Sequence, residues 1–334
     1  MTAAPIQHRR EMGDFEYGRV DQLSPLVRRV ICKNPNPFTY KGTATFIVGR
    51  GEVAVIDPGP TYGVHQDAVL AALGPDEQVS HILVTHTHSD HSPASSAIKE
   101  RTGAPIYGFG PHGTVRPTDP DDKVDFSAYF TTEEKERYDK EYDDLPDELK
   151  REGPDLKFKP EERVEDADVI RGRDWTFEAV WTPGHCSNHL CYELKEERTL
   201  FTGDHVMGWA TSVVGPPDGS MLDYMASLRK LLPRDVDHFR PTHGPVIDEP
   251  IAYVQSFIDH REDREAQILQ FLGEGPKQIP DFVPAMYANY DKRLWYPAAA
   301  SVYAHMLHLV ETGRVRVDGG GEPKLRSTYV LAGA

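Results

Sequence analysis

Three histidines and one aspartate lie within six consecutive positions of the segment VTHTHSDHSPASS, residues 84–96. An apolar run precedes them and a helix-compatible stretch follows, so we expect a strand-to-helix loop that exposes its side chains on a rigid scaffold. In an extended backbone His86 and His88 point to the same side, with Asp90 and His91 following at the turn. Imidazole and carboxylate donors without a nearby thiolate suit zinc, iron or manganese. The segment therefore predicts part of a metal centre rather than a polar loop that contains histidines by chance.

Three later segments each end an apolar strand pattern in a residue type that binds metals: TPGH supplies His185, TGDH supplies Asp204 and THGP supplies His243. Loops that follow the strands of one sheet meet at its edge, so these residues are expected to join the first motif. Seven donors are enough for two metal ions about 3.5 to 4 Å apart that share one carboxylate. Such a pair lowers the pKa of a bridging water, and the resulting hydroxide attacks an acyl or phosphoryl centre.

The elements that must position these loops have the pattern of a mixed α/β domain. Residues 43–57 predict a hairpin of two strands around Gly49–Gly51, and the following segments predict a helix at 64–73, a strand at 81–85, a helix at 95–103 and a strand at 104–109. Further along, strand patterns run into the loops that bear His or Asp, within 174–185, 190–204 and 237–247.

Length and composition favour an intracellular enzyme. The 334 residues are enough for one large and one small domain. Hydrophobic residues make up 39% and are interleaved with charges, and no apolar stretch approaches the roughly 18 residues of a membrane span. The polar N-terminus lacks a signal-peptide core, and three cysteines (Cys32, Cys186 and Cys191) do not make a paired framework, so we expect a reducing, cytoplasmic setting. The net charge of −16 argues against a polyanionic partner.

Much of that charge lies in one region. Residues 121–168 contain 19 acidic and 9 basic residues, and their composition favours helix. Pro-rich segments flank the helix-forming part, so we interpret about 114–168 as a partly helical acidic insertion. The favoured interpretation is a solvated, charged excursion without a chemical role. A lid or an oligomer contact over the active site is the alternative.

HTHSDH, followed by TPGH, TGDH and THGP at increasing distances, resembles the motifs of the metallo-β-lactamase superfamily of metal-dependent hydrolases. The runs TSVVGPPDGSMLDYMASLRKLL, PTHGPVI and FIDHREDREAQIL resemble the β-lactamase-like protein 2 subgroup, whose members add a winged-helix-like domain. The resemblance covers most of the chain except the insertion. It implies an α/β fold, an αββα sandwich over residues 1–249, and a small winged-helix-like domain over residues 250–334.

The resemblance also implies the metal ligands and their grouping. The first metal would take His86, His88 and His185, the second would take Asp90, His91 and His243, and Asp204 would bridge the two. Two divalent ions are expected, with zinc preferred and iron or manganese left open. Asp90, together with the hydroxide, is the expected catalytic residue. Asp57 and His189 are expected to support the ligands, although His189 fits a structural role equally well.

The C-terminal sequence predicts a helix followed by a wing. Val302, Met306 and Leu309 have helical spacing, and two strand-like runs surround Gly319–Gly321. From residue 251 onward there are 9 basic and 10 acidic residues, which favours a docking or dimerisation domain over a nucleic-acid-binding one. The nucleic-acid alternative depends on eight residues gathering on one face: Arg261, Arg264, Lys292, Arg293, Arg314, Arg316, Lys324 and Arg326.

Hydrolysis of an ester, a thioester, or a lactone or lactam is the favoured function. The subgroup's activity on single-stranded RNA makes an endoribonuclease the alternative, and the acidity of the chain argues against it. A small-molecule acyl substrate is therefore preferred over RNA, with no membrane partner and with a homodimer left open. Two further classes are a non-catalytic metal-binding or interaction protein and a flavodiiron-like electron carrier. The complete set of seven donors argues against the former, and His88 and the missing flavin module argue against the latter.

Overall fold

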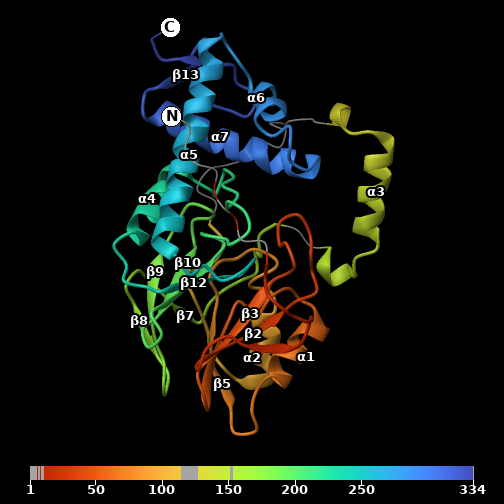
Figure 1. Cartoon of the computed structure of the whole chain (residues 1–334), viewed down its shortest axis with the longest axis vertical. Helices are drawn as coiled ribbons and strands as arrows, with labels where there is room; N and C mark the ends of the chain where they lie inside the picture. The colour runs from red at the N-terminus through yellow and green to blue at the C-terminus, as the bar shows by residue number, and fades with distance from the viewer. Residues whose placement is uncertain (1–5, 7, 9–10, 114–126, 151–152, 334) are drawn as a thin grey trace.

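The computed structural model describes residues 6, 8, 11–113, 127–150 and 153–333. Two β-sheets pack face to face, with helices on their outer surfaces, and a smaller domain of helices and one two-stranded sheet follows (Figure 1). This arrangement confirms the predicted αββα sandwich. The hairpin predicted around Gly49–Gly51 and the helices predicted at 64–73 and 95–103 are also present.

The first sheet has seven strands in sequence order: β1 (Val20–Gln22), β2 (Val27–Ile31), β3 (Ala44–Val48), β4 (Glu52–Ile56), β5 (Gln78–Leu83), β6 (Ile106–Gly108) and β7 (Glu162–Arg163). Strands β1 to β4 are antiparallel to one another. Strands β5, β6 and β7 continue the sheet parallel to β4. The carboxyl ends of β4, β5 and β6 therefore lie at one edge of the sheet.

The second sheet has the order β12-β11-β10-β9-β8, formed by β8 (Val169–Arg171), β9 (Thr176–Trp181), β10 (Leu190–Leu194), β11 (Thr199–Gly203) and β12 (His238–Pro241). Strands β11 and β12 are parallel, and β9 and β11 are both antiparallel to β10. The carboxyl ends of β9, β11 and β12 consequently point in one direction. The loops after these three strands contain the later histidine and aspartate motifs.

Successive side chains of each strand point to opposite faces of its sheet, and the buried ones form three packed layers. Phe46 of β3 meets Phe201 of β11 between the sheets, with ring centroids 4.9 Å apart, whereas Ile47 faces the outer helices. Helices α1 (Gly63–Ala71) and α2 (Ser95–Thr102) contribute Val69 and Ile98 to the layer outside the first sheet. Helix α4 (Met221–Leu231) and the first half of α5 (Pro250–Gly273) cover the second sheet.

Helix α5 belongs to two cores. Its 24 residues extend about 36 Å at the usual helical rise. Val254 and Phe257 pack in the layer outside the second sheet, whereas Ile268 and Leu272 pack in the core of the C-terminal domain. In Figure 1 the helix runs from the sandwich into that domain without a break. The two domains are therefore joined by a continuous buried element and not by a loop alone.

The C-terminal domain adds α6 (Ile279–Met286), the 3-10 turn η3 (Lys292–Leu294), α7 (Trp295–Glu311) and the antiparallel strands β13 (Val315–Val317) and β14 (Tyr329–Leu331). The predicted helix that ends near Gly313 and the two strands after it are thus present. None of the helices in the described part of the chain has the length and apolarity that crossing a membrane requires.

The acidic insertion contains the 3-10 turns η1 (Ser127–Tyr129) and η2 (Asp147–Leu149) and helix α3 (Thr132–Asp143), which buries no residue. Residues 114–126 and 151–152 of the predicted range lie outside the described residues. From residue 154 the chain belongs to the sandwich, because Phe158 is buried beneath the outer helices and β7 extends the first sheet. The charged excursion is therefore shorter than the predicted range 114–168.

Helix α3 docks on the C-terminal domain through polar contacts. Lys292 donates to Glu134 at 3.0 Å, and Arg293 donates to Glu141 at 2.6 Å. The Tyr138 hydroxyl donates to Asp291 at 3.2 Å. One face of the predicted solvated excursion is thus held against the segment that leads into α7 (Figure 1).

Candidate metal centre

Four loops bring the predicted ligands together. The first motif follows β5, and the three later ligands follow β9, β11 and β12 at the corresponding edge of the second sheet. The donor atoms form two groups, each within 4.8 Å: His86, His88, His185 and Asp204 in one, and Asp90, His91 and His243 in the other. We call these seven residues the ligand cluster. Their role as ligands stays a prediction, and their geometry allows it to be tested chemically.

Hydrogen bonds fix which nitrogen of His86 and of His185 points inward. The Thr85 hydroxyl donates to Asp57, so it accepts from His86 Nδ1, 3.0 Å away. His185 Nδ1 donates to the carbonyl of Val213 at 2.6 Å. Both Nε2 atoms are therefore free of protons in the neutral rings and present lone pairs to the interior.

His88 faces both of those lone pairs. Its Nδ1 lies 3.0 Å from His86 Nε2 and 2.9 Å from His185 Nε2. Burial, followed by the neighbouring His185, lowers the pKa of His88 to about 3, and burial lowers the pKa of His86 well below its usual value. Neutral imidazole is the form that binds metals. Three nitrogens so close together share at most one proton and otherwise repel one another, so the arrangement suits a cation.

The second group combines two imidazoles with two carboxylates. His243 Nε2 lies 3.1 Å from Asp90 Oδ2 and 3.3 Å from Asp204 Oδ1. His91 Nε2 lies 3.4 Å from Asp90 Oδ2 and 3.5 Å from Asp204 Oδ1. The other oxygen of Asp204 lies 3.8 Å from His185 Nε2 in the first group. Asp204 thus directs one oxygen toward each group, which is the geometry that a bridging carboxylate needs.

Two buried atoms at this centre have no hydrogen-bond partner among the described residues, His91 Nε2 and Asp204 Oδ1. An unsatisfied buried polar atom is costly unless something else coordinates it. Two divalent ions would satisfy both atoms and would separate the crowded nitrogens of the first group. The residues present therefore fit two metal ions, and histidine with carboxylate admits zinc, iron or manganese.

Asp57 holds the two halves of the centre together, as a support for a ligand histidine should. Its Oδ2 accepts from His91 Nδ1 at 2.9 Å and from the Thr242 hydroxyl at 2.9 Å, and its Oδ1 accepts from the backbone N–H of Thr85 at 2.8 Å. Thr85 follows the first sheet and Thr242 follows the second. This fully buried carboxylate therefore fixes the proton of His91 on Nδ1 and leaves Nε2 free to bind a metal.

His189 supports the backbone and not another imidazole. The N–H of Asp204 donates to His189 Nε2 at 3.2 Å, so Nδ1 carries the proton and donates to the Thr182 hydroxyl at 2.9 Å. Gly203 has a φ of +49°, and a Cβ there would lie 2.6 Å from His189 Nε2. A glycine before Asp204 is thus required for His189 to approach, and His189 orients the loop that carries the bridging carboxylate.

Arg261 of α5 is a contributor that the sequence reasoning did not place at the site. It is buried, lies over the ring of Tyr224 at 5.1 Å, and donates to the carbonyl of Ser212. The hydroxyl of Ser212 donates to the carbonyl of Asp204 at 2.5 Å. A helix shared with the C-terminal domain therefore braces the loop after Asp204. An arginine in a charged helical stretch gives no sequence signal that it is buried.

The returning end of the insertion is a second unpredicted support. Ser89 donates its N–H to the carbonyl of Gly153 at 3.0 Å, and the N–H of Asp155 donates to the carbonyl of Thr87 at 2.6 Å. The Ser92 hydroxyl donates to the carboxylate of Asp155 at 3.0 Å. The loop that carries four of the seven predicted ligands is therefore clamped by residues that the sequence analysis assigned to the excursion.

Comparison with known proteins agrees with the fold and the motifs. Residues 39–243 match the family described as the metallo-beta-lactamase superfamily, and residues 279–322 match the beta-lactamase associated winged helix domain. Similar structures include a beta-lactamase domain protein from Burkholderia ambifaria, with a TM-score of 0.73, 18% identity and 98% of each chain covered. Another is the metallo-beta-lactamase family protein TTHA1429 from Thermus thermophilus, with a TM-score of 0.67, 21% identity, and 93% of this chain and 100% of the other covered.

Two sequence relatives span much of the chain. The beta-lactamase-like protein 2 homolog of Drosophila melanogaster is 30% identical over 312 residues, which cover 90% of this chain and 92% of that protein. The atrochrysone carboxyl ACP thioesterase AgnL7 of Paecilomyces divaricatus is 32% identical over 255 residues, which cover 76% and 66%. The sandwich, the two ligand groups and the family match lead to one conclusion: the chain belongs to the metallo-β-lactamase superfamily and has the winged helix domain that accompanies part of it.

Proposed function

We propose that this protein is a metal-dependent hydrolase of acyl esters, with thioesters as the favoured substrate class. The ligand cluster would hold two divalent ions, three imidazoles on one and Asp90, His91 and His243 on the other, with Asp204 between them. When bound, such ions supply Lewis-acid chemistry, because they lower the pKa of water and polarise a carbonyl group. Overall, the oxygen of water bonds to the acyl carbon, the C–S bond breaks, and the thiol leaves as the acid forms.

The residues around the centre support this chemistry in distinct ways. Asp90 has 24% of its side chain exposed, compared with 12% for Asp204, so it is the carboxylate nearer the opening. Thr43 donates to Asp90 Oδ2 at 3.3 Å and restrains it. His86, His91 and His243 are almost fully buried, and exclusion of water strengthens every electrostatic interaction at the centre.

The preference for an acyl substrate rests on one observation. Most of the basic side chains that an RNA surface would need already contact other groups of the protein. At least six of these eight residues have partners within the protein: Arg261 with Ser212, Arg264 with the ring of Tyr287, Lys292 with Glu134, Arg293 with Asp291 and Glu141, Arg314 with Glu265, and Arg316 with Asp318. Cations that are already neutralised or buried release few counterions when they meet phosphates, so they add little affinity for RNA. A polyanion groove is therefore not favoured.

The relatives agree with this preference. Two of them, from Paecilomyces divaricatus and Cryptosporiopsis, carry the name atrochrysone carboxyl ACP thioesterase, at 32% and 30% identity over more than three quarters of this chain. A thioester bound to a carrier and a small-molecule thioester place the same bond at the metal centre. We therefore choose thioesters ahead of lactones, lactams and RNA as the first substrate class to test.

The experiment is a screen of the metal-loaded protein against four substrates: an N-acetylcysteamine thioester, a p-nitrophenyl ester, a chromogenic cephalosporin and a short single-stranded RNA. Asp90→Asn tests the centre, and Asp139→Asn on the exposed surface of α3 is the matched control. We expect thioester hydrolysis to be fastest, to fall on the order of a hundredfold or more in Asp90→Asn, and to persist in Asp139→Asn. Activity that survives Asp90→Asn would come from a contaminant and would contradict the proposal.

RNA provides the competing outcome. If RNA were the substrate, its binding would weaken on the order of a hundredfold between about 50 and 200 mM salt, because several phosphates would be contacted. We expect thioester hydrolysis to depend little on salt over that range. RNA cleavage that is faster than thioester hydrolysis, with a steep dependence on salt, would replace the acyl hydrolase with an endoribonuclease. A protein that binds two metals and hydrolyses none of the four would instead favour a non-catalytic role.

A further inference from the structure

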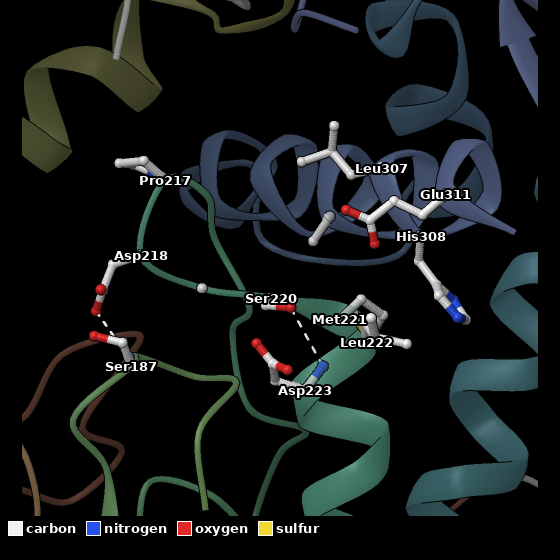
Figure 2. Close-up of a pocket in the computed structure, with 12 residues that line it drawn as sticks. Ser187, Pro217, Asp218, Ser220, Met221, Leu222, Asp223, Leu307, His308 and Glu311 are labelled. Atoms are coloured by element: carbon white, nitrogen blue, oxygen red, sulfur yellow. Dashed lines mark hydrogen bonds between the residues drawn. The ribbon is translucent and has the colours of Figure 1, made fainter. Parts of the chain in front are cut away.

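Among the cavities of the described residues, two lie between the sandwich and the C-terminal domain. The smaller one, about 80 Å³, is lined by the loop of Ser187 and Asp218, the start of α4, and Leu307 and Glu311 of α7 (Figure 2). Ser187 donates its N–H to Asp218 at 2.9 Å across its floor. The larger one is a cleft of about 410 Å³ that is wide open to solvent, and its volume lies in the range of roughly 300 to 1,000 Å³ usual for small-molecule sites. Only the larger one has room for an acyl group with a ring system.

Aromatic and apolar side chains form most of the wall of the larger cavity. The rings of Tyr40 and Trp209 are stacked, with centroids 5.0 Å apart and planes inclined by 14°. Pro35, Pro37 and Leu294 complete the apolar lining. The ammonium of Lys41 lies over the Tyr40 ring at 5.4 Å, and a planar group packs in offset or edge-to-face geometry against the parts of the two rings that line the cavity. The wall therefore favours a flat, unsaturated group over a flexible aliphatic chain of the same volume.

Both rings are attached directly to the second ligand group. Tyr40 lies two residues before Gly42, whose carbonyl accepts from His243 Nδ1 at 3.3 Å. Trp209 packs on Gly244, the residue after that ligand, where a Cβ would lie 3.0 Å from the indole Cδ1. The segment of Tyr40 and the ring of Trp209 therefore both contact the loop of His243, which joins the wall of the cavity to the second group.

The loop that carries Tyr40 is rigid before any ligand arrives. Tyr40 has a φ of +57°, which is strained for a residue with a side chain, and strain of this kind is retained where the surroundings determine it. The N–H of Tyr40 donates to the carbonyl of Asn36 at 3.0 Å, and the Asn36 side chain accepts from the N–H of Thr39 at 3.0 Å. The stack is therefore pre-organised, so a ligand loses little free energy to ordering it.

Charge at the mouth of the cavity is balanced. Arg293 lines it, but its guanidinium donates to Asp291 at 2.6 Å and to Glu141 of α3 at 2.6 Å. The single cation among the lining residues thus has two carboxylate partners. An anionic ligand such as a phosphate gains little here, so the cavity suits a neutral group.

We infer that this cavity binds the acyl part of the substrate and selects planar, unsaturated acyl groups over aliphatic ones. The inference rests on the proposed thioester hydrolysis and assigns a substrate class to it. Tyr40 and Trp209 form the selective wall, and the insertion contributes indirectly because Glu141 of α3 holds Arg293 at the mouth.

The test compares N-acetylcysteamine thioesters of acetic, octanoic and 2-naphthoic acids with the metal-loaded full chain. In wild type we expect the naphthoyl thioester to have the lowest KM. Trp209→Leu should raise the KM of the naphthoyl thioester about tenfold, change that of the acetyl thioester by less than about twofold, and leave kcat nearly unchanged. Phe38→Leu is the matched control, because Phe38 lies in the same loop as Tyr40 and is exposed outside the cavity. It should leave all three KM values unchanged.

A second variant distinguishes a change in the cavity from a loss of structure near His243, which Trp209→Leu could also cause. Leu294→Trp fills the cavity from the other side without touching the ligand loops, and it should raise the KM of the naphthoyl thioester at least fivefold while the acetyl thioester is unaffected. Equal KM changes for all three thioesters in Trp209→Leu, with metal content retained, or an unchanged naphthoyl KM in Leu294→Trp, would overturn the acyl cavity. Absence of hydrolysis of every thioester by wild type would instead refute the proposed function.

Discussion

Two clusters of histidines and carboxylates in the described residues differ in how their buried polar atoms are paired. In the ligand cluster, three imidazole nitrogens face one another at about 3 Å. In the C-terminal domain, Glu265 of α5 accepts from His308 at 2.6 Å, from His305 at 3.3 Å and from Arg314 at 3.2 Å, and we call these four residues the Glu265 cluster. There His305, His308 and Arg314 all face one carboxylate, whereas in the first group of the ligand cluster neutral imidazole nitrogens face one another.

The difference separates structural polar groups from groups arranged for a ligand. In the Glu265 cluster the carboxylate has all its partners within the cluster, although His305 Nε2 is buried without a hydrogen-bond partner among the described residues. Although burial opposes ionisation, the two histidines lower the pKa of Glu265 to about 2. In the ligand cluster a carboxylate oxygen, Asp204 Oδ1, and an imidazole nitrogen, His91 Nε2, lack partners among the described residues, and metal ions would satisfy both. Removing an ion should therefore damage one cluster, and changing pH moderately should affect the other.

Metal removal should have the largest effect. Purified without chelator, the protein should carry close to two transition-metal ions per chain, and a chelator should lower its unfolding temperature. Ions present at about a thousand times their dissociation constant stabilise a fold by about 4 kcal/mol. Asp204→Ala should lose both ions because its two oxygens face both groups, and hydrolysis should fall on the order of a hundredfold or more. Elemental analysis measures the occupancy.

Glu265→Gln provides the contrast for that experiment, since it should retain both ions and most of the activity. A metal content near zero in wild type grown with zinc, iron and manganese would contradict the interpretation of the ligand cluster.

The two groups of the ligand cluster should separate when single ligands are removed. His185→Ala should weaken mainly the first ion and His243→Ala mainly the second, so each variant should keep about one ion per chain, whereas Asp204→Ala should keep neither. Metal titration followed by calorimetry distinguishes the two sites. Equal loss in all three variants would mean that the ions bind as one inseparable unit.

Glu265→Gln should destabilise the protein by about 1 to 2 kcal/mol near pH 5 to 6. Glu265 has a folded-state pKa of about 2, so its contribution is complete above its ordinary pKa, about 4.5, and is lost as pH falls toward 2. The hydrogen bond that His308 donates to Glu265 raises the pKa of His308, so that contribution is complete below about pH 6.5 and is lost as pH rises through the folded-state pKa.

Chemical denaturation at several pH values measures this difference. The gap between wild type and variant should be widest in the window of pH 5 to 6 and should shrink at pH 3 and at pH 9. A gap that is constant with pH would show that packing and not charge accounts for the effect of Glu265.

Deletion of residues 132–150 should have the smallest effect, because it leaves in place Tyr129 and Phe130, which pack against the C-terminal core. Helix α3 buries no residue, and its ion pairs with Lys292 and Arg293 are partly exposed, so each is worth about 0 to 1 kcal/mol. Both clusters should survive, with metal content unchanged and stability within about 1 kcal/mol, because closing a loop of different length costs little. A large loss of metal would show that α3 supports the ligand cluster.

A wider deletion, from residue 117 to 159, is the informative comparison. It removes Phe158, which is buried in the sandwich, and loss of such a ring costs about 3 to 5 kcal/mol. It also removes the contacts of Asp155 and Gly153 with the loop of the first four ligands. The wider deletion should therefore weaken metal binding where the narrower one does not.

The regular parts of this fold follow from local patterns in the sequence. The hairpin at β3 and β4, the helices α1, α2 and α7, and the final two strands were all predicted, because alternation and helical spacing report which face is buried. Strand β2 was not predicted. Its sequence VRRVI places Arg28 and Arg29 in buried positions, where they pair with Glu77 and Asp21, and such pairing is visible only in three dimensions.

The candidate site shows the same division. The dense motif at residues 86–91 and the three later loops predicted all seven members of the ligand cluster, and the fold brings them together, although their role as ligands stays a prediction. Asp57 was expected as a support, and it accepts from His91. Arg261, Ser212 and Asp155 were missed, because each acts through one backbone or hydroxyl contact formed by tertiary packing. The end of the insertion was placed too late because charge continues past residue 153, although Phe158 is already inside the sandwich.

The position of α5 in the chain has a consequence for synthesis on the ribosome. His243, the last of the seven predicted ligands, is translated before Arg261, which braces the loop of Asp204, and before Val254 and Phe257, which cover the second sheet. A nascent chain therefore holds every donor before it can close the layer above them. Until α5 emerges, α4 alone covers the second sheet, so part of its apolar surface stays exposed, and such surfaces promote aggregation. We expect ribosome-bound chains that end at residue 249 to remain protease-sensitive, and chains that include the whole of α5 to become resistant.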